Sequence, residues 1–226
     1  AAAVASRREP VAIDRCSVCH GVFSKDFLVH GGIRNETRYC PVCHNPSNDT
    51  LSRELPPAGE TAMTSPIDFK VMIHKIHRGE ELADPYVLYG FPTGKFPNQT
   101  STATNFQELL YPGALRDCQA CHLPGTYVLS PGAGILGPGV LPSTVRSFLQ
   151  GERDKTVLDV FTTPPTIAVC TSCHDDVDFT TGANHAAGPQ SEGSCVDCHG
   201  VGRSLSVERT HFPGVAREAR ILRPNN

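Results

Sequence analysis

The chain has 226 residues, a formal net charge of −3 and 19% charged residues, so no excess of basic side chains points to nucleic acid. No stretch approaches the roughly 20 consecutive apolar residues that cross a bilayer, so no transmembrane segment is predicted. With 39% hydrophobic residues, no Trp, 20 Gly and 19 Pro, the chain is poor in core side chains and rich in turns for its length.

Residues 1–14 are predicted to form an N-terminal arm. Residues 1–5 are small and apolar but lack the basic start and the long hydrophobic run of a signal peptide, so we interpret them as a remnant of processing or a linker. Residues 6–14 are polar apart from a brief Val-Ala-Ile run, which predicts a short strand or an extended segment. The arm carries no recognisable chemistry.

Beyond the arm, all ten cysteines fall in five Cys-x-x-Cys-His units. This unit is the attachment signature of c-type haem. Its two thiols, on one short turn, can bond to the two vinyl groups of one porphyrin, while the histidine offers its imidazole to the iron. The sequence predicts five covalently bound haem c groups, attached through Cys16, Cys19, Cys40, Cys43, Cys118, Cys121, Cys170, Cys173, Cys195 and Cys198, with His20, His44, His122, His174 and His199 as axial ligands.

Two other uses of cysteine pairs fit this pattern less well. Five disulfides in an exported chain would not require a histidine after each pair. Zinc ribbons consume cysteine pairs two at a time, so five pairs would leave one over. We therefore expect haem.

A longer unit occurs twice along the chain. It consists of a haem motif, a lone histidine, and a second motif whose first cysteine follows that histidine by ten residues. The lone histidines of the two copies are His30 and His185. Because they share one offset, we predict that both are distal axial ligands; the alternative is that they are ordinary surface histidines.

A helix is predicted between Ser65 and Gly79. Ser65 suits the N-cap, a proline follows at the first helical position, and Gly79 suits the end of the helix. His74 and His77 lie three residues apart, about 60° apart around a helix that turns every ~3.6 residues. They can serve two neighbouring metal centres, but they cannot be the two opposite ligands of one.

Loops are predicted to dominate the rest of the chain. Residues 80–117 form a long loop with a helical turn near 105–111, and residues 124–142 form a second loop. A helix is predicted over residues 143–151, and residues 203–212 bring a final histidine, His211. The aromatic side chains of the first loop, Tyr86, Tyr89, Phe91 and Phe96, are expected to lie against haem.

Five histidines remain outside the motifs, one for each predicted haem. They are His30, His74, His77, His185 and His211. Met63 and Met72 could compete as ligands, but we interpret Met63 as a loop residue and Met72 as part of the helix core. We predict histidine on both sides of every iron, which gives low-potential centres with no open position for a substrate.

The fold is expected to be mainly irregular, with short α-helices and little or no β-sheet. One porphyrin for every 45 or so residues leaves too little protein to wrap each separately. The haems are therefore expected to pack closely and to form the core. We predict one pentahaem domain over residues 1–226, with haem binding over 15–212 and a peripheral tail over 213–226.

Several segments resemble the outer-surface decahaem cytochromes of the OmcA/MtrC type. The similar segments are Phe69–Leu82 with both histidines of the predicted helix, His30–Arg34, Cys40–Pro46 and Tyr111–Cys118. In that family five haems form one module, which alternates with β-barrel domains and passes electrons to metal oxides, flavins or other cytochromes. This chain has room for one such module only. It is either a fragment or a compact relative, and end-to-end stacking of a compact relative would join its haems into a filament.

The predicted function is electron transfer without catalysis. Haem is attached to such motifs outside the cytoplasm, so we expect an exported protein at the cell surface or in the extracellular space, rather than in the periplasm. Its expected partners are other multihaem cytochromes, redox shuttles or minerals. The alternative is a multihaem reductase with one open haem that acts on a small oxyanion.

Overall fold

The structure of the chain is a computed structural model. It describes residues 9–23, 25–27, 29–95, 98–130 and 140–211. The predicted tail at 213–226, the first eight residues of the arm and the middle of the loop predicted over 124–142 lie outside these ranges.

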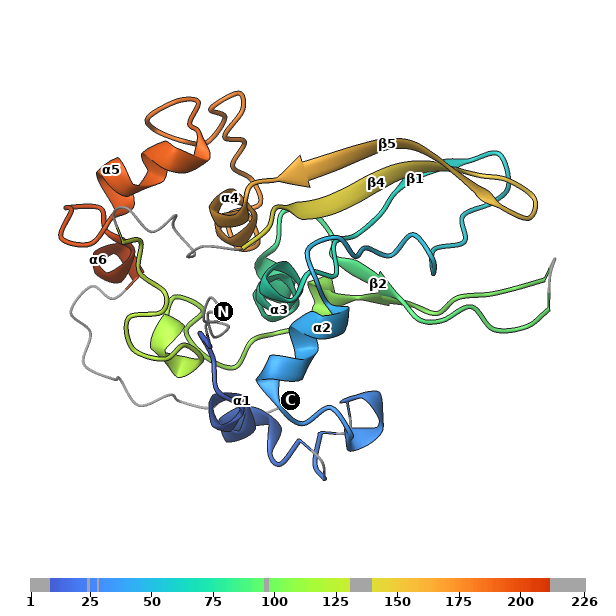
Figure 1. The fold of residues 1–226 in the computed structure, drawn as a ribbon, viewed down its shortest axis with the longest axis horizontal. Helices are drawn as coiled ribbons and strands as arrows, with labels where there is room; N and C mark the ends of the chain where they lie inside the picture. The colour runs from blue at the N-terminus through green and yellow to red at the C-terminus, as the bar shows by residue number, and fades with distance from the viewer. Residues whose placement is uncertain (1–8, 24, 28, 96–97, 131–139, 212–226) are drawn as a thin grey trace, which may run out of the picture.

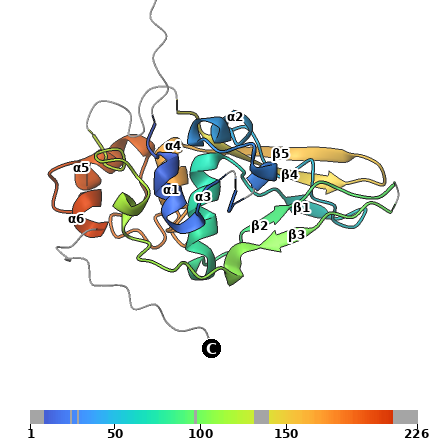
Figure 2. The ribbon, with the colours of Figure 1, turned by 90° about the horizontal axis from the view of Figure 1, so that it is seen from below.

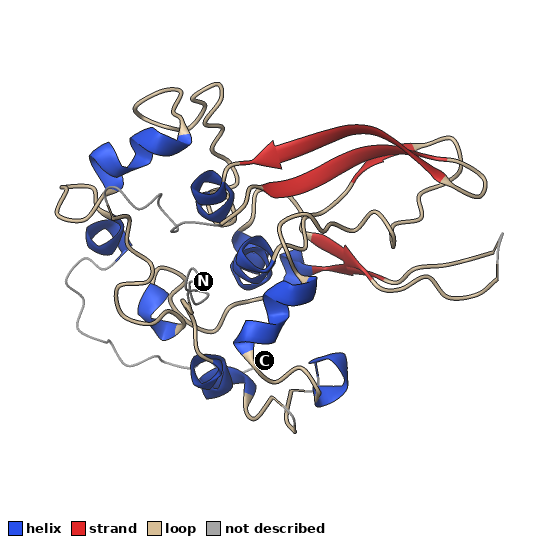
Figure 3. Cartoon of the chain, in the orientation of Figure 1, coloured by secondary structure: helices blue, strands red, loops and turns tan. Residues whose placement is uncertain are grey.

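Helices and strands occupy different sides of the molecule (Figure 1; Figure 3). The α-helices of the described residues are α1 (Ile13–His20), α2 (Cys40–Cys43), α3 (Phe69–Arg78), α4 (Pro165–Cys170), α5 (Cys195–His199) and α6 (Val207–His211). Single 3₁₀ turns are η1 (Val29–Gly32), η2 (Thr37–Tyr39), η3 (Gly79–Glu81), η4 (Phe106–Glu108), η5 (Cys118–Ala120) and η6 (Glu192–Ser194). The strands are β1 (Thr61–Met63), β2 (Val87–Tyr89), β3 (Ala103–Asn105), β4 (Ser143–Gln150) and β5 (Lys155–Thr163).

The expectation of little or no β-sheet was wrong. A three-stranded antiparallel sheet has the order β1-β4-β5, and β4 occupies most of the stretch predicted as a helix over residues 143–151. The Gly151 N–H donates to the Asp154 carbonyl at 2.8 Å and closes a hairpin onto β5, which is rich in β-branched and aromatic residues. Pairing along this hairpin outweighs the helix propensity of so short a segment, and Phe148 is fully buried beneath it.

A second, two-stranded antiparallel sheet lies within the predicted loop over residues 80–117. It pairs β2 with β3, from Val87 opposite Asn105 to Tyr89 opposite Ala103. The helical turn predicted near residues 105–111 is confirmed as η4, whose Gln107 N–H donates to the Asn105 side chain at 3.0 Å.

The predicted central helix is confirmed as α3, but it begins later than expected. Ser65 and Pro66 are not helical, because the Ser65 N–H donates to Thr50 Oγ1 at 2.8 Å and Pro66 forms a β-bridge with Asp49. The helix ends at Gly79, which has a φ of +47° and donates to the Lys75 carbonyl. A glycine suits this position, since a side chain strains the left-handed region.

The apolar face of α3 packs against the chain that follows it. Met72, Leu82 and Tyr86 form a buried cluster, and the partly buried residues around it are Ile67, Phe69, Ile73, Ile76, Leu88 and Phe106. Met72 is therefore a core residue, as predicted. Met63 ends β1 and is 54% exposed, so its placement in a loop was wrong.

The end of the N-terminal arm is held against the third haem motif. The Pro10 carbonyl accepts from the Leu123 N–H at 2.8 Å and from Thr126 Oγ1 at 2.9 Å. Val11 forms a β-bridge with His122. Across the described ranges, the helices are too short or too polar to span a lipid bilayer.

Candidate haem-binding sites

Each Cys-x-x-Cys-His motif is wound into a short helical turn. The first, second and fifth motifs lie in or at the end of α1, α2 and α5, the third begins in η5, and the fourth begins at Cys170, the last residue of α4. Within the second, third and fourth motifs, the histidine N–H donates to the carbonyl of the first cysteine at 2.7–2.9 Å. The turn places two thiols and an imidazole together, which is the arrangement that covalent haem attachment needs.

All ten cysteines are described, and all are free thiols. None of them therefore takes part in the disulfides that the sequence left as an alternative. Within the described residues, no three His, Cys, Asp or Glu side chains converge on a point where they could hold a metal ion directly.

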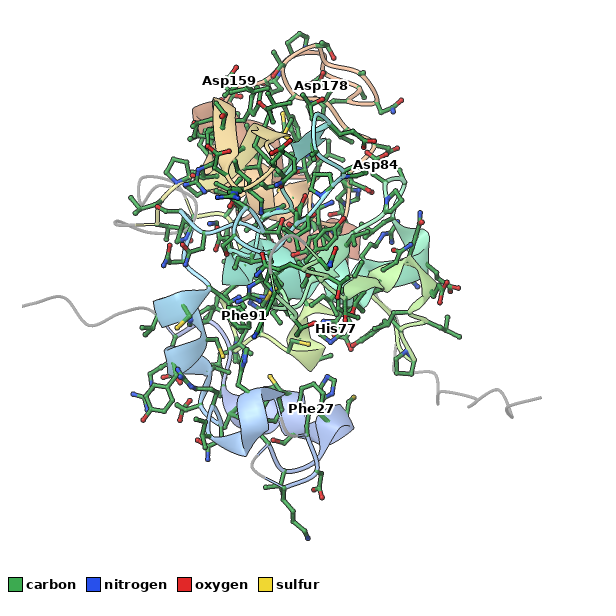
Figure 4. The ribbon with its side chains drawn as sticks, turned by 90° about the vertical axis from the view of Figure 1, so that its right-hand side faces the viewer. Phe27, His77, Asp84, Phe91, Asp159 and Asp178 are labelled. Atoms are coloured by element: carbon green, nitrogen blue, oxygen red, sulfur yellow. The ribbon has the colours of Figure 1, made fainter. Side chains whose placement is uncertain are left out.

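The five motif histidines each lie next to one of the five other histidines. The ring centroids are separated by 5.9 Å for His20 and His77, 6.0 Å for His44 and His30, 5.9 Å for His122 and His74, 6.2 Å for His174 and His211, and 6.4 Å for His199 and His185. All ten predicted ligands are thus brought together, two by two, with no histidine left over. Figure 4 marks His77 on α3 and Phe27 in the segment that follows α1.

These separations fit a metal held between two imidazoles. A metal lies about 2 Å from each ligating nitrogen, so the centres of two opposed rings lie about 6 Å apart. His74 and His77 approach different motif histidines, as their spacing on the helix predicted. In Figure 2, which views the molecule from below, α1, which ends at His20, is drawn nearer the viewer than α3, and the His20 and His77 rings connect the two helices.

In six of these ten histidines, the ring nitrogen Nδ1 is hydrogen-bonded to a backbone carbonyl. Nδ1 of His44, His77, His185, His199 and His211 lies 2.8–3.0 Å from the carbonyl oxygens of Ile67, Ile73, Gly188, Leu205 and Val207 respectively. Nδ1 of His74 is likewise bonded to the Lys70 carbonyl. Because a carbonyl only accepts, Nδ1 carries the proton and Nε2 keeps the lone pair that a metal needs.

Each copy of the repeated unit has a non-glycine residue of positive φ at its lone histidine or just before it. His30 itself has a φ of +50°, and Asn184, just before His185, has a φ of +58°. Non-glycine residues rarely adopt this conformation, and such strain is concentrated at functional sites. In both copies, the chain therefore makes a tight turn at the lone histidine, ten residues before the first cysteine of the next motif.

Burial keeps several of these imidazoles neutral. It lowers the pKa of His20, and the neighbouring His77 lowers it further. Burial also lowers the pKa of His44, of His74 and of His174. A neutral ring offers its lone pair to iron at neutral pH, whereas a protonated ring would not.

The thiols show which attachment sites are neighbours. Burial, together with the nearby Cys121 and Cys40 thiols, raises the pKa of Cys16 to about 11. Burial raises the pKa of Cys118 to about 11, with a contribution from Cys173. Burial raises the pKa of Cys170 to about 12, with a contribution from Cys195. The first attachment site therefore neighbours the second and the third, the third neighbours the fourth, and the fourth neighbours the fifth.

Two of the four aromatic residues expected beside haem, Tyr86 and Phe91, have other partners. Tyr86 is buried in the core, where its hydroxyl donates to the Pro66 carbonyl at 2.6 Å, and Phe91 lies under the Arg53 guanidinium at 4.0 Å. Phe96 lies outside the described residues. The rings that approach candidate ligands include Phe23 and Phe27 near His20, Tyr111 near His77, Tyr127 near His122 and Phe179 near His185. Phe23 and Phe27 follow the first motif by three and seven residues, but nothing in that spacing indicates a contact with the ring.

The chain matches a known protein family over residues 8–212, that of outer membrane cytochromes described as MtrC/MtrF-like, domains II/IV. No curated protein and no solved structure matches it. Cytochromes of this family are extracytoplasmic proteins of the cell surface that bind haem c and carry electrons. The match extends over most of the sequence, and the chain therefore belongs to the MtrC/MtrF-like family of outer membrane cytochromes.

Proposed function

We propose that the chain is a pentahaem electron carrier with histidine on both sides of each iron. The observation that carries this proposal is the set of five imidazole pairs, each made of one motif histidine and one other histidine. Bound haem supplies reversible one-electron chemistry between ferric and ferrous iron. The protein supplies the anchoring, the ligands and the surroundings.

Each group of residues has a distinct role in this proposal. The two thiols of a motif would hold the porphyrin through thioether bonds. The histidine of the motif and its partner would both bind the iron, and the carbonyl at Nδ1 orients the imidazole ring. An iron held by two imidazoles would offer no site to a reactant, which favours electron transfer over inner-sphere catalysis.

Because neighbouring attachment sites adjoin one another, the bound haems would form one continuous row. The first site adjoins both the second and the third, and the row continues through the fourth site to the fifth. His74 and His77 fix the spacing of the first and third sites, because both histidines belong to one rigid helix. The second and fifth sites are the ends of the row, where electrons would enter and leave.

The partners follow from this arrangement and from the family. Electrons would pass from one end of the row to other multihaem cytochromes, redox shuttles or mineral acceptors outside the cell. We treat residues 15–212 as one haem-binding domain.

Copies of the chain that stack end to end would join their rows of haems into a filament. A protein that remains monomeric in gel filtration at high concentration would contradict that arrangement.

The ligands are tested with His77→Ala in the haem-loaded protein. We expect one of the five irons to become five-coordinate and high-spin, as measured by electronic absorption and electron paramagnetic resonance (EPR). His74→Ala should affect a different iron, since its partner is His122 rather than His20. Ile76→Val, on the same helix, is the control and should leave all five low-spin. Ready binding of cyanide or nitrite by the resting wild-type protein would overturn the proposal.

A further inference from the structure

A buried ion pair joins β4 to the chain that follows the second haem motif. Nη1 of Arg146 donates to Oδ2 of Asp49 at 2.8 Å, and the Asp49 side chain is 2% exposed. Thr64 Oγ1 donates to the same oxygen at 2.9 Å, and the Leu51 N–H donates to Oδ1 at 3.0 Å. Without Arg146, a buried carboxylate would lose its counter-charge.

Strand β4 also binds the backbone around this carboxylate. The Thr144 N–H donates to the Pro46 carbonyl at 2.9 Å, and Nη2 of Arg146 donates to the Ser47 carbonyl at 3.3 Å. The segment over residues 46–49 is therefore attached to β4 at three residues, Pro46, Ser47 and Asp49. It begins two residues after His44, the histidine of the second motif.

Ile67 connects this segment to the imidazole of His44. Asp49 forms a β-bridge with Pro66, and the Ile67 N–H donates to the Asn48 carbonyl at 3.2 Å. The Ile67 carbonyl in turn accepts from Nδ1 of His44 at 3.0 Å. The position of that carbonyl, and with it the plane of the ring, depends on how the sheet holds residues 46–49.

We propose that Arg146 and Asp49 are positioning residues for the second haem. They act through Ile67 on the plane of the His44 ring. This inference rests on the proposed function, in which His44 and His30 are the two ligands of that haem. The angle between their rings is 39°. The relative orientation of two axial imidazoles determines the splitting of the iron d orbitals, and the hydrogen bond at Nδ1 raises the basicity of the ligand.

The test uses Arg146→Gln in the haem-loaded protein, with a redox titration and EPR as measurements. We expect one of the five midpoint potentials to rise, because a looser bond to Ile67 makes His44 a weaker donor, and one low-spin EPR signal to change with it. The affected centre is identified with His30→Ala, which should make the same centre five-coordinate. Arg146→Lys keeps the charge and should restore most of the wild-type behaviour.

Phe148→Leu is the matched control, since Phe148 lies on the same strand, fully buried, and its side chain is apolar. It should lower the melting temperature and leave all potentials unchanged. If Arg146→Gln does not fold, Thr64→Val removes one donor to Asp49, keeps the ion pair, and should shift the same centre by a smaller amount.

Two results would overturn different claims. If the folded variants only melt earlier, like Phe148→Leu, with potentials and spectra unchanged, the network is merely structural and the inference fails. If His30→Ala leaves every iron low-spin and six-coordinate, the ligand assignment of the proposed function fails instead.

Discussion

At single residues, the backbone decides which nitrogen of a histidine keeps a free lone pair for a metal. In six of the ten histidines a carbonyl oxygen accepts from Nδ1, and these carbonyls come from helices, from tight turns and from the segment before α3. A helix supplies such an acceptor four residues before the ring, as Lys70 does for His74 and Ile73 does for His77. Helical ligands therefore need no side-chain partner for their orientation.

Gly79 is predicted to tolerate no side chain. A Cβ added there would lie 2.1 Å from the Leu109 carbonyl oxygen, and the φ of +47° is itself unfavourable for other residues. Gly79→Ala should destabilise the protein by about 2 kcal/mol or more and lower the melting temperature by at least ~4 °C. Gly59→Ala is the control, because Gly59 also has a positive φ, of +87°, but has no atom within 4 Å of the added Cβ. Equal effects of the two substitutions would contradict the predicted clash.

Glu54 is predicted to make stability depend on pH. Its side chain is buried, and burial raises the pKa of its carboxyl group, although it accepts hydrogen bonds from Thr50 Oγ1 and the Ser65 N–H. The folded protein thus holds this proton to a higher pH than the unfolded chain, and stability is lost as the pH rises through the raised pKa. Glu54→Gln should melt at a higher temperature than the wild type at pH 7 and at a similar temperature near pH 4.

The exposed Glu60 provides the control for this comparison. Glu60→Gln should leave the melting temperature unchanged at both pH values. A Glu54→Gln protein that is less stable than the wild type at pH 7 would mean that the ionised carboxylate is stabilising.

At the scale of elements, a residue just before the fifth motif caps the helix that leads to the fourth motif. The N-terminus of α4, which leads to the fourth motif, has no local side-chain cap. Instead, the Thr166 and Ile167 N–H groups donate to the Glu192 carboxylate at 2.8 Å and 3.1 Å. Glu192 lies three residues before the fifth motif, so this cap links the last two attachment sites.

Glu192→Ala is expected to destabilise the protein by about 1–2 kcal/mol, because it removes a charged cap from the positive end of a helix. The melting temperature should fall by roughly 2–8 °C. Asp176→Ala, which removes an exposed carboxylate from the same part of the chain, should change little. A loss in Glu192→Ala no larger than in this control would show that the cap contributes nothing measurable.

At the scale of the whole molecule, the formal charge is unevenly distributed along the row of sites. Residues 164–211, which include the fourth and fifth motifs, contain six acidic and two basic side chains, a formal charge of −4, whereas the complete chain carries −3. Bound haems would add two propionates each. The fifth site should therefore attract cationic partners and repel anionic ones.

The rate of electron exchange with small charged redox reagents should depend on this negative charge. Oxidation of the reduced protein by a cationic metal complex should slow about tenfold between ~10 mM and ~0.5 M salt, and oxidation by an anionic complex should accelerate. Stopped-flow absorbance measures both rates. Asp197→Lys, at an exposed position of the fifth motif, should weaken both salt dependences. Equal salt dependences for the two reagents would contradict electrostatic steering.

The sequence by itself determined which residues are predicted to bind haem. A Cys-x-x-Cys-His motif lies within one helical turn, so its function depends on residues that are neighbours in the chain, and the five spare histidines could be counted directly. The central helix was also readable, because its apolar spacing and its terminal glycine are local signals.

Only the tertiary structure decided the partners and the sheets. His77 pairs with His20 across 57 residues of chain and His211 with His174 across 37, so no local pattern indicates which rings meet. A helix is predicted over residues 143–151, but β4 forms there, because pairing with β1 and β5 stabilises it. Neither pairing partner can be recognised from the local sequence. Contacts between distant segments depend on the packing of the whole chain, and spacing along the sequence does not record that packing.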